Sequence, residues 1–155
     1  MTYLADLTGT GRLKRVGYLS RGHSFISGTT SEEFFDRLVG LEEHPFLISC
    51  GYHSCDIGGC RRILRSEEAQ PTLHYKDRIL FLGDTDIYVP DEEVVYVAPS
   101  LVLHYIQHHQ YQPPACFVEA VLNCPEPLSE EYCAAITRIA PEINLPLPDR
   151  SRSLP

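Results

Sequence analysis

The segment CGYHSCDIGGC, residues 50–60, places three cysteines and one histidine within eleven positions. Thiolate sulfur and imidazole nitrogen are the ligands that zinc commonly takes in proteins, usually four of them in a tetrahedron. Two adjacent glycines allow the chain to turn back on itself, so that His53, Cys55 and Cys60 can approach one ion. Because a turn this short cannot supply all four ligands without strain, we expect partner ligands from elsewhere in the chain.

The segment LHYIQHH, residues 103–109, offers those partners. It has the pattern of a helix, in which His104 and His108 project from one face, one turn apart. Helical histidine pairs with this spacing chelate zinc in metalloenzymes. His109 lies about 100° further round the helix and is expected to face solvent. The sequence therefore predicts a Cys2His2 site for Zn2+ composed of Cys55, Cys60, His104 and His108.

Three other residues are substitute or additional ligands in this interpretation. Cys50 and His53 belong to the same turn, and His23, in the stretch RGHSF, is either a ligand or a polar core residue. The remaining cysteines fall within or at the end of helical apolar patterns, where a small buried side chain is expected. They are therefore interpreted as structural residues: Cys116, Cys124 and Cys133.

Catalytic alternatives use the same residues. Cys55 with His53 or His104 as base would allow nucleophilic catalysis without a metal. A zinc ion with an open coordination position would instead need a general base for a hydrolase or lyase reaction. The candidate acids are Asp84, Asp86 and Glu119, but no motif ties any of them to the cysteine and histidine pattern. No catalytic residue is assigned.

The chain has 155 residues and a formal net charge of -8, which fits one domain and argues against nucleic acid or anionic lipid as a partner. It contains no run of about 20 apolar residues that could span a membrane. Asp6 stands where a signal peptide would need its apolar segment. We therefore expect a cytoplasmic protein whose six cysteines stay reduced.

Apolar spacing and turn signals predict an α+β fold with a small antiparallel sheet and three to four helices. Thr30 is the expected N-cap of the first helix. A β-hairpin is predicted over residues 78–90, and a loop over residues 61–77. The other elements are strands at 45–50 and 93–98 and helices at 100–109, 114–123 and 129–140. Residues 1–140 are expected to form one zinc-binding domain, followed by a flexible, proline-rich tail at 141–155.

Several stretches together resemble an uncharacterised bacterial family common in actinomycetes. They are MTYLADLT, VGYLSRGHSFISG, GYHSCDIGGC, IYVP and VVYVAPSLVLHYIQHHQYQPPACFVEAV, and together they span roughly residues 1–125. The family pattern has a Tyr-Phe-Ala-Asp-Leu-like start, a Trp-His-x-Cys-x-x-Cys-like knuckle and a His-Tyr-x-x-x-His-Gly-Tyr-x-Pro-Pro-like motif. The resemblance implies that its motif positions are occupied by His23, His53, Cys55, Cys60, His104 and His108.

This chain departs from the family pattern at the knuckle. It has C-x4-C where the family has C-x2-C, and the longer loop leaves Cys50 as a substitute for Cys60. The resemblance supports a metal site and names no substrate. The sequence thus predicts a small zinc-binding protein with a structural site and a binding or regulatory role. The alternative is a zinc enzyme acting on a small molecule, and the protein or small-molecule partner is not identified.

Overall fold

The computed structural model describes residues 3–48, 53–60 and 71–143. A four-stranded sheet with the strand order β1-β6-β5-β2 lies at its centre. Its strands are β1 (Leu13–Arg15), β2 (Leu47–Ile48), β5 (Thr85–Pro90) and β6 (Val95–Pro99). β1 runs parallel to β6, whereas the β6–β5 and β5–β2 pairs are antiparallel. The α+β class is confirmed, and the central sheet is mixed rather than purely antiparallel.

The described residues form four α-helices, namely α1 (Glu32–Glu43), α3 (Val102–His109), α4 (Ala115–Leu122) and α5 (Glu130–Ile139). A 3-10 turn, η1 (Pro141–Ile143), follows α5. The N-cap of α1 is Ser31, whose hydroxyl accepts a hydrogen bond from the Phe34 amide at 3.1 Å. The sequence predicted this N-cap at Thr30, which is one residue too early. Because several hydroxyl residues precede this helix, its cap depends on where the helical backbone begins.

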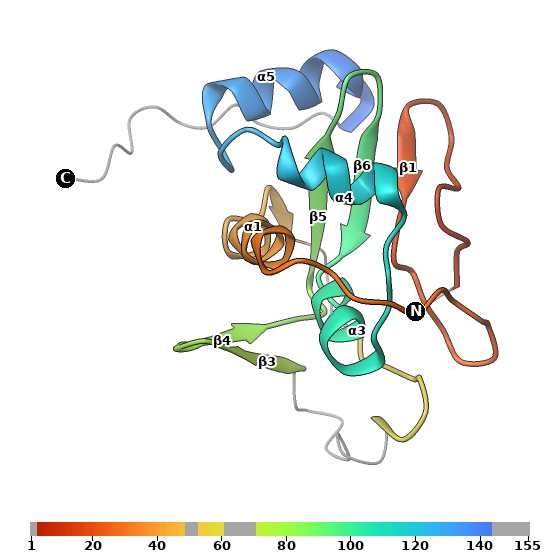
Figure 1. Ribbon diagram of the computed structural model, residues 1–155. Helices are drawn as coiled ribbons and strands as arrows, with labels where there is room; N and C mark the ends of the chain where they lie inside the picture. The colour runs from red at the N-terminus through yellow and green to blue at the C-terminus, as the bar shows by residue number, and fades with distance from the viewer. Residues whose placement is uncertain (1–2, 49–52, 61–70, 144–155) are drawn as a thin grey trace.

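Aromatic side chains connect the helices to the sheet. α4 crosses in front of β5 and β6, with α1 beside it and α5 at one end of the sheet (Figure 1). The fully buried Phe117 of α4 makes edge contacts with Phe34 of α1 and Tyr96 of β6. On α5, the Tyr132 hydroxyl donates to the carbonyl of Tyr88 on β5 at 2.6 Å. Helix α5 therefore belongs to the same core as the central sheet.

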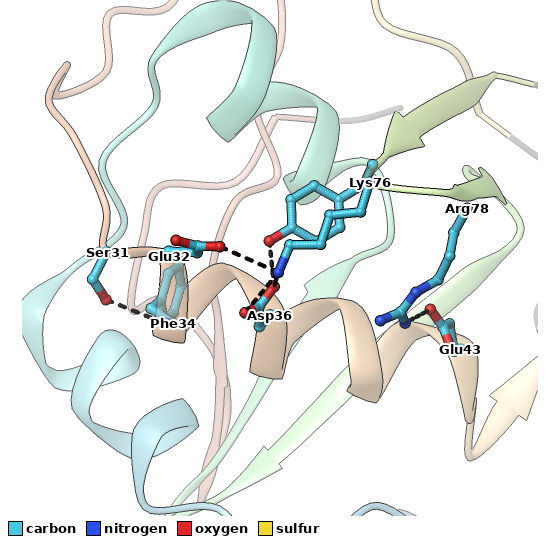
Figure 2. A network of polar contacts seen from close by, with 8 residues as sticks. Ser31, Glu32, Phe34, Asp36, Glu43, Lys76 and Arg78 are labelled. Carbon is cyan, nitrogen blue, oxygen red and sulfur yellow. Dashed lines mark hydrogen bonds and ion pairs between the residues drawn. The ribbon is translucent and has the colours of Figure 1, made fainter.

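A separate hairpin is formed by β3 (Thr72–Tyr75) and β4 (Arg78–Phe81). It lies against α1, to which Lys76 is joined by ion pairs with Glu32 at 3.2 Å and Asp36 at 3.1 Å. Arg78 pairs with Glu43 further along the same helix (Figure 2). Since these ion pairs are solvent-exposed, they orient the hairpin more than they stabilise it.

The predicted hairpin over residues 78–90 was wrong. Its two β-rich runs form β4 and β5, which belong to different sheets, and β4 pairs with a strand in the segment predicted to be loop. Gly83 lies in the connection between β4 and β5 and has φ +96°. A Cβ at this position would come within 2.3 Å of the His53 carbonyl oxygen. This glycine lets residues 53–60 approach the β4–β5 connection closely.

Candidate metal centre

Residues 53–60, named here the cysteine turn, are held in place by hydrogen bonds at His53 and at Asp56. The His53 amide donates to the Gly83 carbonyl at 2.8 Å. The Asp56 carboxylate accepts hydrogen bonds from the Ser20 hydroxyl and the Arg21 amide, both at 3.0 Å. These bonds connect the cysteine turn to the β4–β5 connection and to the N-terminal segment.

The turn has the local geometry of a thiolate site. The Ile57 amide donates to Cys55 Sγ at 3.4 Å, and the Cys60 amide donates to the Ile57 carbonyl at 3.4 Å. Gly58 has φ +59°, a left-handed conformation that glycine adopts without steric cost. An amide that points at sulfur stabilises the thiolate, so this backbone is suited to hold cysteines as metal ligands.

Helix α3 brings two imidazoles to the two sulfurs. Cys60 Sγ lies 3.6 Å from His104 Nε2 and 3.2 Å from His109 Nε2, and Cys55 Sγ lies 3.4 Å from His109 Nε2. One ligand atom from each of the four residues lies within 4.8 Å of all the others. Tetrahedral zinc with ordinary bond lengths would separate sulfur and nitrogen ligands by about 3.6 Å. The observed separations therefore match those of two thiolates and two imidazoles around one ion.

The structure thus brings together three of the four predicted ligands, with His109 in place of His108. His108 is exposed, and its ring centroid lies 4.8 Å from that of His104. The expectation that His109 faces solvent was wrong, because the cysteine turn packs on the side of α3 that carries the buried Tyr105. His109 follows Tyr105 by four residues and shares that side. The helix then ends at Gln110, with φ +55°.

Burial sets the protonation of the cluster in the absence of a cation. It raises the pKa of the Cys55 thiol to about 12, so this thiol is protonated at neutral pH. Burial lowers the pKa of His104 to about 4, and electrostatic repulsion from the nearby His108 and His109 contributes to the decrease. A neutral imidazole is the form that binds metals, and a bound dication would favour the thiolate.

Tyr105 adds a buried phenol beside the cluster. Its side chain is fully buried, and its hydroxyl has no hydrogen-bond partner among the described residues. Burial raises its pKa, and the nearby Cys55, Asp56 and Cys60 raise it further. A phenol next to thiolate ligands can donate a hydrogen bond to sulfur once the thiols have lost their protons. Sequence reasoning missed this residue, since a tyrosine on an apolar helix face looks like an ordinary core residue.

The substitute ligands lie elsewhere. His23 is exposed and stacks on Tyr3, with ring centroids 3.7 Å apart, and it does not belong to the cluster. His53 is exposed and lines a small cavity together with Gly83 and Asp86. Cys50 lies outside the described residues.

The candidate acids and the other cysteines do not belong to the ligand group. Among the described residues, the ligand group contains no carboxylate. Glu119 is exposed on α4, and Asp84 is half-buried between β4 and β5. Cys124 and Cys133 are buried as predicted, but Cys116 is exposed, because the inward side of α4 is occupied by Phe117 and Ala120.

The fold and the cluster together define an α+β domain with a Cys2His2 group that could hold a metal ion. The chain belongs to a family described as a domain of unknown function, DUF7919, whose sequence model matches residues 1–122. This range includes all four members of the cluster and ends with α4. No curated protein and no solved structure matches the chain. None of the helices in the described ranges is long and apolar enough to cross a membrane.

Proposed function

We propose that this chain is a zinc-binding protein in which Cys55, Cys60, His104 and His109 hold a structural ion. The ion would fasten the cysteine turn to α3. In this proposal the domain acts in the cytoplasm by binding a protein or small-molecule partner. The resemblance of its motifs to actinomycete sequences supports a bacterial origin.

The convergence of four ligand atoms within 4.8 Å carries this proposal. Two sulfurs and two imidazole nitrogens favour zinc over the harder calcium and magnesium ions. A closed set of four protein ligands is typical of structural sites, whereas catalytic zinc keeps a position for water. The nearest carboxylate in sequence, Asp56, already accepts two hydrogen bonds from the N-terminal segment. These observations support a structural ion over a zinc hydrolase or lyase.

The two adjacent histidines provide a matched test of the ligand set. We expect untagged wild-type protein and His108→Ala to contain one zinc per chain by elemental analysis, and His109→Ala to lose most of it. Cys55→Ser should lose zinc as well. Circular dichroism of each variant would separate loss of metal from loss of fold.

Cobalt substitution tests whether the site is closed. Co2+ in wild-type protein should give the intense visible bands of a tetrahedral ion and a thiolate-to-cobalt charge-transfer band. Because three protein ligands and one water are also tetrahedral, azide would then be added: a change in these bands would favour the enzyme interpretation, since an anion can bind only at an open position. Retention of full zinc content by both Cys55→Ser and His109→Ala would overturn the proposed ligand set.

A further inference from the structure

A small polar cavity borders Gly83, and His53, the first residue of the cysteine turn, forms part of its wall. It has a volume of about 140 Å3, and its polar walls are formed by Arg15, Tyr18, His53, Thr85 and Asp86. Pro99 and Leu101 complete an apolar side. A cavity of about 150 Å3 holds one benzene molecule, so this one accommodates a ligand of about six non-hydrogen atoms.

Thr85 is the feature of this cavity that most needs an explanation. The residue is 92 % buried, since only 8 % of its surface is exposed. Its Oγ1 has no hydrogen-bond partner among the described residues. Buried polar groups are nearly always paired, and leaving one unpaired costs stability. This oxygen has almost no accessible surface, so a molecule in the cavity would not contact it, and Thr85 contributes to the wall rather than to recognition.

The other polar groups form an ordered row. The Tyr18 hydroxyl donates to Asp86 Oδ1 at 3.3 Å and accepts from Arg15 Nη1 at 3.4 Å. Tyr18 is itself buried, and in the described part of the chain Asp86 Oδ2 accepts no hydrogen bond. The cavity therefore presents a guanidinium donor and a carboxylate acceptor on either side of the Tyr18 hydroxyl, which is hydrogen-bonded to both.

These charges select the ligand. The carboxylate of Asp86 would repel an anion, and the guanidinium of Arg15 would repel a cation, so a neutral molecule is favoured. Such a molecule must donate to the carboxylate and accept from the guanidinium along one edge. An amide or urea group does both, because its N–H and C=O lie next to each other.

We propose that this cavity binds a small neutral amide- or urea-type molecule whose N–H donates to Asp86 and whose C=O accepts from Arg15. This site is separate from the metal cluster and does not depend on the identity of the ion. It supplies a small-molecule partner class that the metal site by itself does not indicate.

Two probes of equal size test the recognition. 2-Pyrrolidinone and γ-butyrolactone each have six non-hydrogen atoms and a ring carbonyl, but only the lactam has an N–H. Titrated into 15N-labelled, zinc-loaded full-length protein, the lactam should shift the amide resonances around residues 83–86 with a Kd on the order of 1 mM. The lactone should bind at least tenfold more weakly. Equal binding of both, no binding of the lactam at 50 mM, or tighter binding of acetate or ethylammonium would overturn the proposal.

The Asp86→Ala variant gives an independent readout. Alanine removes the carboxylate that would accept the lactam N–H, so we expect the affinity for the lactam to fall at least tenfold. Thr85→Val removes only the unpaired buried hydroxyl, so it should retain binding while its Tm rises by about 2–5 °C. An Asp86→Ala protein that binds the lactam as well as the wild type would overturn the proposal.

Discussion

The surroundings of Phe117 and the surroundings of His109 are stabilised by different interactions. At Phe117, helices α1, α4 and α5 bury aromatic and aliphatic side chains against the central sheet. At His109, a short turn with few apolar side chains meets the end of α3 through sulfur and imidazole. Hydrophobic burial can hold the first region by itself, whereas the second is suited to stabilisation by an ion. The comparison teaches that the fold and the cysteine turn can be perturbed separately.

The largest effect is expected in the apolar region. Phe117→Ala removes a fully buried ring and should lower the free energy of unfolding by about 3–5 kcal/mol. Urea denaturation would measure it, with and without zinc. The loss should be the same in both conditions, and a loss seen only with zinc would contradict the separation of the two regions.

Zinc should stabilise the wild type by about 2.7 kcal/mol when buffered at one hundred times its Kd. The same denaturation experiment on Cys55→Ser should show almost no dependence on zinc, because one ligand of the cluster is missing. Cys116→Ser changes an exposed cysteine outside the cluster and is the matched control. Equal zinc dependence of the two variants would disprove a metal site at Cys55.

Glu42 is a buried acid of α1, and its effect on stability depends on pH. Burial, with nearby Asp84 and Glu43, raises its pKa from 4.5 to about 7. Below pH 4.5 the residue is protonated in both folded and unfolded chains, so it has no cost there. As the pH rises from 4.5 to 7, the unfolded chain ionises while the folded chain stays protonated, so folding loses about 2 kcal/mol, and the loss is complete above pH 7.

Glu42→Gln removes that cost. The variant should match the wild type near pH 4.5 and be more stable by about 2 kcal/mol at pH 8, measured by urea denaturation at both values. Glu33→Gln, on the exposed side of the same helix, should change stability much less. A gain of equal size at pH 4.5 would contradict the raised pKa.

The smallest effect concerns the start of α1. Ser31→Ala removes the hydroxyl that caps the Phe34 amide and should cost about 1 kcal/mol. Thr30→Ala should cost less, since its side chain is not the cap. Thermal unfolding of the two variants distinguishes them, and a larger loss for Thr30→Ala would restore the cap expected from the sequence.

Much of the fold could be predicted because its signals are local. Helical apolar spacing predicted the four described helices to within a few residues, and the hydroxyl-containing segment before α1 indicated where that helix begins. The partner of β4 was not predictable in this way. Residues 72–75 show little apolar pattern, since only Leu73 among them is buried, whereas the run after Gly83 looked like a suitable hairpin partner.

The sequence by itself determined which kinds of atom are available for a metal site. Two cysteines in a glycine-containing turn and histidines at the end of a helix are properties of local segments. Helical periodicity then fixed the angles between His104, His108 and His109, but angles within a helix do not say which side another segment will approach. Only the tertiary structure decided in favour of His109, by docking the cysteine turn on the Tyr105 side of α3 through bonds to Gly83, Ser20 and Arg21.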